Sequence, residues 1–125
     1  MQINNTSIEG LKVETTTISR DHRGTFERYF CENGLGSLLG GRRIIQSNHS
    51  CTHKIGTFRG MHYQNQSHAE MKLIRCLRCK VWDVAVDLGH GSATFLQWHV
   101  HELSSKLQNL FVDLGFAPLF SKRLS

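Results

Sequence analysis

Short stretches rich in β-branched and aromatic residues, separated by turn residues, constrain the fold of this chain more than any other feature. The first stretch, 11–18, alternates in polarity and contains three consecutive threonines, which is typical of a half-buried strand. No apolar period of 3.6 residues persists over 11 positions, so helix should be scarce. We expect further strands at 25–30, 43–49, 57–64, 70–77, 81–88, 95–103 and 109–112, and a loop with one short helical turn at 33–41.

Many short strands spaced near ten residues apart indicate a β-sandwich or a β-barrel. The chain has 125 residues, which is enough for one hydrophobic core and too few for two. No internal repeat, low-complexity segment or linker divides it. We therefore predict a single, mostly β domain over residues 1–125.

The segment Gly-Thr-Phe-Arg-Gly-Met-His-Tyr-Gln, residues 56–64, concentrates residue types suited to a small-molecule site. A regular pleat would place Arg59 and His62 on opposite faces of the strand. Gly60 is a position where a bulge could turn both side chains to one face. Lys72 follows ten residues after His62. A base next to cations favours proton-transfer chemistry on an anionic substrate.

The strand expected at 81–88 sorts its side chains by alternation. Asp83, Ala85 and Asp87 should share one face, and the tryptophan and two valines between them the other. A carboxylate on the apolar strand is thus a candidate for lining the same site.

The net charge of +5 raises the question of nucleic-acid binding. The lysines and arginines are dispersed, however, with short pairs only at 42–43 and 122–123, and no nucleic-acid motif is present. A site for one or two phosphates explains the surplus equally well, so we expect no nucleic-acid partner.

No apolar run approaches the roughly 20 residues that cross a bilayer. The first residues lack the basic and apolar regions of a secretory signal. We therefore expect no membrane association and a cytoplasmic location.

The four cysteines do not form a dense framework. Cys76 and Cys79 have the C-x-x-C spacing, but structural zinc normally requires four ligands and no second such pair exists. We expect all four cysteines to be reduced.

Several ordered motifs together resemble the dTDP-4-dehydrorhamnose 3,5-epimerases, a family of sugar-nucleotide enzymes. The matching segments run from about residue 11 to 117 in the family's order: 21–26, 46–50, 58–64, 72–75, 81–88, 92–95, Trp98, 102–104 and 115–117. The resemblance implies a cupin-like β-barrel or jelly roll. It fades after about 117, so the fold is expected to be incomplete at the C-terminus and the chain shortened relative to the family.

The resemblance also implies roles for individual residues. His62 corresponds to the general base that removes protons next to the C4 ketone of the sugar, and Lys72 to the residue that meets the developing enolate charge. Asp83 is expected to line the site, and Arg59 to bind the diphosphate. The implied nucleotide-contacting residues are Arg23, Phe26, Glu27, Gln46 and Asn48.

The implied activity is epimerisation at C3 and C5 of dTDP-4-dehydro-6-deoxyglucose, in deoxysugar biosynthesis. The family works without metal or organic cofactor, and its members dimerise by exchanging N-terminal strands, so a homodimer and a dTDP-sugar substrate are expected. Segments of the family that carry an aspartate partner of the base and a tyrosine acid have no counterpart here, and activity could be impaired.

Two alternatives stay open from the sequence. One is a relic that binds a nucleotide sugar without turning it over. The other is a metal-binding cupin that uses histidines and a glutamate, for which His62, His68, Glu70, His99 and His101 are the available residues. We expect His99 and His101 to lie on an exposed face instead.

Overall fold

A computed structural model describes residues 2–62, 70–107, 109–113 and 119–124. The prediction of a mostly β chain with little helix is confirmed within this part of the chain. Its elements are β1 (Gln2–Asn5), β2 (Leu11–Thr15), β3 (Ile18–Asp21), β4 (Gly24–Glu27), α1 (Glu32–Leu39), β5 (Phe58–His62), β6 (Lys72–Arg75), β7 (Lys80–Asp87), β8 (Trp98–Ser104), β9 (Asn109–Asp113) and β10 (Leu119–Leu124). No helix in the described ranges is long and apolar enough to cross a bilayer.

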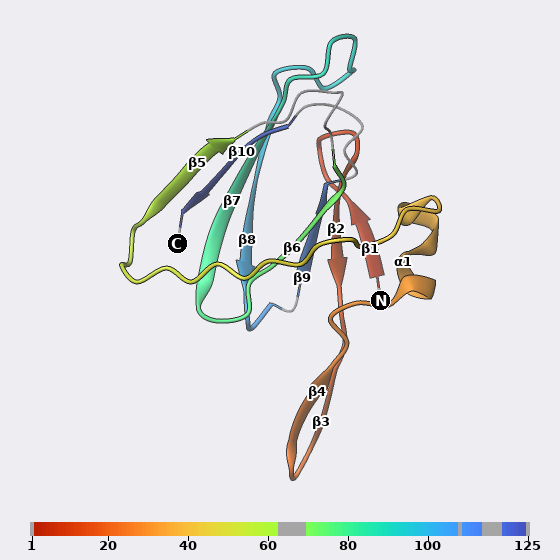
Figure 1. Ribbon diagram of the computed structural model, residues 1–125, viewed down its shortest axis with the longest axis vertical. Helices are drawn as coiled ribbons and strands as arrows, with labels where there is room; N and C mark the ends of the chain where they lie inside the picture. The colour runs from red at the N-terminus through yellow and green to blue at the C-terminus, as the bar shows by residue number, and fades with distance from the viewer. Residues whose placement is uncertain (1, 63–69, 108, 114–118, 125) are drawn as a thin grey trace.

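The strands form two four-stranded sheets and one separate hairpin (Figure 1). One sheet has the order β1-β2-β9-β6 and the other the order β5-β10-β7-β8. A core cluster joins them, with Leu11 and Val13 from the first sheet packed against Ala85 and Leu103 from the second. The inner faces of the two sheets are therefore the faces that carry these four residues. The hairpin of β3 and β4 projects away from both sheets.

A second core lies on the back of the β1-β2-β9-β6 sheet. Leu35 and Leu39 of α1 are buried there in one cluster with Leu110 and Val112 of β9. The sequence predicted a loop with one short helical turn, but α1 has eight residues. Two leucines at i and i+4 fall on one helix face, and their burial outweighs the low helix propensity of the intervening glycine. Gly40, at φ 56°, ends the helix in the left-handed conformation.

The strand predicted at 43–49 is wrong. Residues 42–53 have no strand or helix and form an exposed connection, in which the Ile45 side chain is 92% exposed. The β-branched residues of this segment favour a strand only when a neighbouring strand pairs with them and covers one face.

The first predicted strand is divided in the structure. Residues 11–15 pair with β9 as β2, and residues 18–21 leave the sheet to pair with β4. Periodicity predicted the extended conformation over 11–18 but could not indicate that the strand changes partner.

The segment where the family resemblance fades contributes a central strand. β10 pairs antiparallel with β5 on one side and with β7 on the other. It thus connects the strand that carries His62 to the strand that carries Asp83.

Candidate functional site

An irregularity in β5 sets the direction of two predicted site residues. Ser121 of β10 pairs with His62, whereas the next residue, Lys122, pairs with Gly60, so β5 contains one extra residue. Gly60 has φ 123°, which favours glycine. The predicted irregularity at Gly60 is confirmed. It places Arg59 and His62 on the same face of the sheet.

The register identifies that face as the inner one. Arg59 pairs with Arg123 of β10, which in turn pairs with Asp83 of β7. His62 is likewise related to Ala85, because both pair with Ser121. The burial of β7 alternates, with Asp83, Ala85 and Asp87 buried, so the predicted sorting of this strand is confirmed. Arg59, His62 and Asp83 are thus brought to one surface.

Lys72 approaches from the other sheet. It begins β6 and pairs with Asp113 of β9, which also pairs with Leu11 of β2. The Leu11 side chain belongs to the core between the sheets, so Lys72 lies on the same inner face. The Lys72 side chain is half-buried, whereas those of Arg59 and His62 are exposed. Arg59 and His62 therefore belong to one sheet face, and Lys72 belongs to the face that opposes it.

Two histidines extend this inner face. His99 and His101 of β8 pair with Ala85 and Asp83 respectively, and their rings stack at 5.9 Å between centroids. Both are half-buried, so the expectation of an exposed face is wrong. The prediction failed because alternation fixes which residues share a face but not which face is inside.

The surroundings of these histidines favour their neutral forms. The amide nitrogen of Asn109 lies 2.7 Å from Nε2 of His101, and the Ser7 hydroxyl lies 3.4 Å from Nδ1 of His99. Burial lowers the pKa of His99, and burial together with the neighbouring His99 lowers the pKa of His101.

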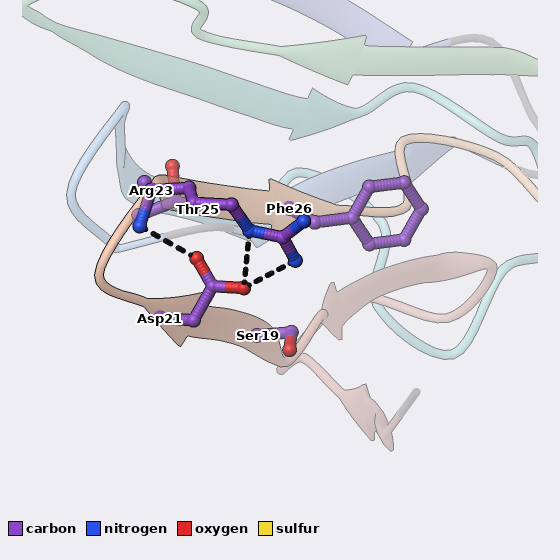
Figure 2. Close-up of a pocket in the computed structure, with 6 residues that line it drawn as sticks. Ser19, Asp21, Arg23, Thr25 and Phe26 are labelled. Carbon is purple, nitrogen blue, oxygen red and sulfur yellow. Dashed lines mark hydrogen bonds and ion pairs between the residues drawn. The ribbon is translucent and has the colours of Figure 1, made fainter.

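Three predicted nucleotide-contacting residues lie on the β3–β4 hairpin. An open pocket of about 310 Å³ on this hairpin is lined by Ser19, Asp21, Arg23, Gly24, Thr25 and Phe26 (Figure 2). The Asp21 carboxylate accepts a hydrogen bond from Arg23 Nη2 at 2.7 Å. This interaction lowers the pKa of Asp21. The Phe26 side chain is 69% exposed, as an aromatic platform for a planar ligand would be.

Glu27 has a different partner from the rest of the hairpin. Its carboxylate lies 3.8 Å from Nη1 of Arg75 on β6, and the Arg75 guanidinium lies over the Tyr29 ring at 4.8 Å. Glu27 thus anchors the base of the hairpin to the sheet rather than lining the pocket.

Gln46 and Asn48 lie on the exposed connection that leads to β5. The same connection provides Thr52, whose hydroxyl oxygen lies 3.4 Å from Nε and from Nη2 of Arg59. The sequence contained no signal for Thr52, because its role depends on where the connection returns to β5.

The predicted site residues therefore fall into two groups. Arg59, His62, Lys72 and Asp83 belong to the facing sheets, whereas Arg23 and Phe26 lie on the projecting hairpin. A single chain does not bring the two groups to one place.

The metal-binding alternative gains no support from the described residues. Within the ranges that the structure describes, no three or more histidine, cysteine, aspartate or glutamate side chains gather in a way that could hold a metal ion. His68 lies outside these ranges.

Comparison with known proteins gives one family. The family model described as dTDP-4-dehydrorhamnose 3,5-epimerase matches residues 5–123. The dTDP-4-dehydrorhamnose 3,5-epimerase of Sinorhizobium fredii is 40% identical over 101 residues, which cover 80% of this chain and 52% of the relative. The chain therefore spans about half the length of this relative.

Solved structures agree with the sequence comparison. The dTDP-6-deoxy-D-glucose-3,5-epimerase of Legionella pneumophila, in complex with dTDP-4-keto-L-rhamnose, has a TM-score of 0.81 and 34% identity, covering 98% of this chain and 69% of that one. A 3'-monoepimerase of Streptomyces bikiniensis, in complex with dTDP-quinovose, has a TM-score of 0.86 and 28% identity, with coverages of 96% and 60%. The cupin-like jelly-roll prediction is confirmed by these similarities.

Proposed function

The chain belongs to the dTDP-4-dehydrorhamnose 3,5-epimerase family, and on this premise we propose that it epimerises C3 and C5 of dTDP-4-dehydro-6-deoxyglucose. One observation carries the proposal. The extra residue in β5 turns Arg59 and His62 to the same inner face as Asp83, opposite the sheet that provides Lys72. A base and a phosphate-binding cation then act on one bound molecule.

In the proposed reaction, the His62 imidazole removes the proton from the carbon next to the C4 ketone. The electron pair of the broken C–H bond delocalises onto the ketone oxygen as an enolate, and the Lys72 ammonium stabilises that charge. Return of a proton to the opposite face of the carbon inverts the centre. Each epimerisation thus begins and ends at the same oxidation level, which requires no redox cofactor.

The remaining residues position the substrate. Arg59 presents a planar guanidinium that matches phosphate oxygens, and Thr52 holds it from the side. The buried Asp83 lies on the same sheet face as Arg59. Gln46 and Asn48 would contact the nucleotide from the exposed connection.

We propose a cytoplasmic homodimer, in which exchanged N-terminal segments complete each site. Its support is the separation of the two residue groups, because the pocket with Arg23 and Phe26 lies on a hairpin that projects from its own chain. An isologous pair of such hairpins would supply each partner with the nucleotide-binding surface that it lacks.

Deuterium exchange tests the chemistry. The chain is incubated with dTDP-4-dehydro-6-deoxyglucose in D₂O, and deuterium at C3 and at C5 is measured separately by NMR. We expect incorporation at both carbons and a loss of at least about 100-fold in His62→Ala. His90→Ala is the matched control, since His90 is an exposed loop histidine, and it should exchange normally.

Binding of dTDP separates catalysis from recognition. His62→Ala should still bind dTDP in calorimetry, whereas Arg59→Ala should bind it more weakly. Nucleotide binding by the unaltered chain without any exchange would favour the non-catalytic alternative. Exchange at C3 alone would assign a monoepimerase.

Mixing two inactive variants tests the dimer. Arg23→Ala impairs the hairpin and His62→Ala the base, so one of the two sites in a mixed dimer would combine intact residues. Random mixing should restore about a quarter of the activity. No recovery would mean that each site is built from one chain.

A further inference from the structure

The corner between β6 and β7 carries both cysteines of the C-x-x-C segment, and the proposed epimerisation uses neither. The Cys76 thiol donates a hydrogen bond to the carbonyl of Arg78 at 3.2 Å and lies 3.6 Å from the carbonyl oxygen of Cys79. The first thiol therefore contacts the backbone of the residue that carries the second. Neither cysteine is part of a disulfide in the structure.

Both ends of this corner are fixed. Cys76 is half-buried and packs against the core cluster between the two sheets. The carbonyl of Cys79 accepts a hydrogen bond from the backbone N–H of Ser105 at 3.2 Å. Only two residues separate the cysteines, and the corner crosses from one sheet to the other. The pair is thus held close by the fold rather than by chance encounter of mobile loops.

Cys79 adopts a backbone conformation that its residue type disfavours. Its φ of 63° lies in the left-handed region, where a residue with a Cβ is uncommon. Residues held in such conformations cluster at functional sites. The side chain of Cys79 is also exposed, which allows a reagent in solution to reach its sulfur.

We propose that Cys76 and Cys79 form a redox-modification site that closes to a disulfide by exchange with an anionic low-molecular-weight disulfide, such as glutathione disulfide. Arg78 and Lys80 flank Cys79 and are exposed. Lys80 also lies 3.6 Å from the Glu102 carboxylate, so the attraction for the carboxylates of such a reagent comes mainly from Arg78. The exposed Cys79 meets the reagent, and the half-buried Cys76 completes the exchange.

The reaction proceeds in two exchange steps. The Cys79 thiolate attacks one sulfur of the reagent, so that a mixed disulfide forms and one thiol leaves. The Cys76 thiolate then attacks the Cys79 sulfur and releases the second thiol. The two cysteines lose two electrons to the reagent disulfide, and their two protons end on the two released thiols.

The modification would link the two strands that carry predicted site residues. β6 begins at Lys72 and β7 contains Asp83, and these strands belong to different sheets. Closure of the corner would therefore fix covalently the joint between the two sheet faces.

Mass spectrometry of the full chain tests the proposal. The reduced chain is incubated with glutathione disulfide, remaining thiols are blocked with N-ethylmaleimide, and the protein is weighed intact and after trypsin digestion. We expect N-ethylmaleimide on only two of the four cysteines. The mass of this monomer should be two hydrogen atoms below that of a chain with two blocked and two free thiols. Since trypsin cuts after Arg75, Arg78 and Lys80, the disulfide should appear as the peptide 76–78 linked to the peptide 79–80.

Matched variants separate this result from general thiol oxidation. Cys51→Ser removes another exposed cysteine and should leave the linked peptides unchanged. Cys76→Ser should stop at a mixed disulfide on Cys79. If Cys76→Ser fails to fold, Cys79→Ser at the exposed position serves instead and should abolish the link. A stable mixed disulfide on Cys79 of the unaltered chain, or a link found only between two chains, would overturn the proposal.

Discussion

Two fully buried carboxylates, in two regions of the molecule, have opposite surroundings. Asp87 ends β7, and its oxygens accept hydrogen bonds from the backbone N–H of Gly89 at 2.8 Å and from the hydroxyls of Ser92 and Thr94 at 2.6 Å each. Glu14 lies on the helix-covered back of the other sheet, where neither carboxylate oxygen has a hydrogen-bond partner among the described residues.

The comparison shows that burial alone does not set the charge state of a carboxylate. Burial would raise the pKa of Asp87, but the three donors outweigh it and lower the pKa below the ordinary value. Burial raises the pKa of Glu14, and the attraction of Arg75 offsets this only in part. The loop beyond β7 thus stabilises the ionised form of Asp87 through hydrogen bonds, whereas the surroundings of Glu14 disfavour its ionised form.

The largest effect is expected from removing the carboxylate that is fully hydrogen-bonded. Asp87→Ala leaves three donors without their acceptor and should lower the free energy of unfolding by about 3 kcal/mol. Asp87→Asn retains one acceptor oxygen and should cost roughly half as much. Urea unfolding at pH 7 measures both. Equal losses in the two variants would mean that the shape of the side chain matters and its hydrogen bonds do not.

The same comparison predicts that the contribution of Asp87 to the free energy of unfolding depends on pH. Because the folded-state pKa of Asp87 lies below the unfolded value of 3.8, its contribution is complete above that pH and is lost as the pH falls through the folded-state value. The stability difference between the unaltered chain and Asp87→Asn should therefore shrink below pH 3.8.

Glu14→Gln should change the free energy of unfolding in the opposite direction and stabilise the fold. The folded-state pKa of Glu14 is raised above 4.5, so the ionised form destabilises the fold once the pH rises through that value. Replacing it with the neutral isostere should raise the free energy of unfolding by about 1 kcal/mol at pH 7. The gain should disappear below pH 4.5, where the carboxyl is protonated in both states. A loss of stability at pH 7 would show that the Arg75 attraction dominates.

The half-buried, stacked histidines His99 and His101 extend the comparison from carboxylates to imidazoles. Since burial holds the pKa of His99 and His101 below 6.5, folding favours their neutral forms, and stability should fall as the pH drops below 6.5. Between pH 6.5 and pH 5, the free energy of unfolding of the double variant His99→Gln, His101→Gln should fall by about 1 kcal/mol less than that of the unaltered chain. Thermal unfolding across this range measures the difference. His53→Gln, at an exposed position, should follow the unaltered chain.

The smallest effect is expected for an exposed carboxylate. Asp21 is paired with Arg23 on the hairpin, where the two side chains are 47% and 79% exposed. Water and salt screen such a pair, so Asp21→Asn should leave the urea midpoint unchanged. A measurable shift would indicate that the hairpin is more ordered in solution than its exposure implies.

Local patterns predicted much of this molecule. Alternation identified the buried face of β7, and Gly60 marked the irregularity that turns Arg59 and His62 to one side. These features depend on a few consecutive residues, which is why the sequence contains them. The resemblance identified the family and the fold from ordered motifs.

What could not be predicted depends on contacts between distant residues. The exposed position of 43–49 follows from the lack of a pairing strand there, and the burial of His99 and His101 depends on which side of the sheet meets the core. The unpaired burial of Glu14 arises on the sheet face where its neighbours across the strands are Leu110 and Ile3, a pairing that local patterns do not reveal. The division of the site residues between sheets and hairpin appears only in three dimensions.

The place of β10 has a consequence for how the molecule is made. β5 has no other strand partner in the described part of the chain, and β10 separates it from β7. During synthesis, β5 therefore cannot pair with β10 until more than fifty further residues have left the ribosome. Over this time its edge is open to water and to other chains. Until then, no neighbouring strand fixes the position of the histidine, and the open edge of β5 is accessible to chaperones.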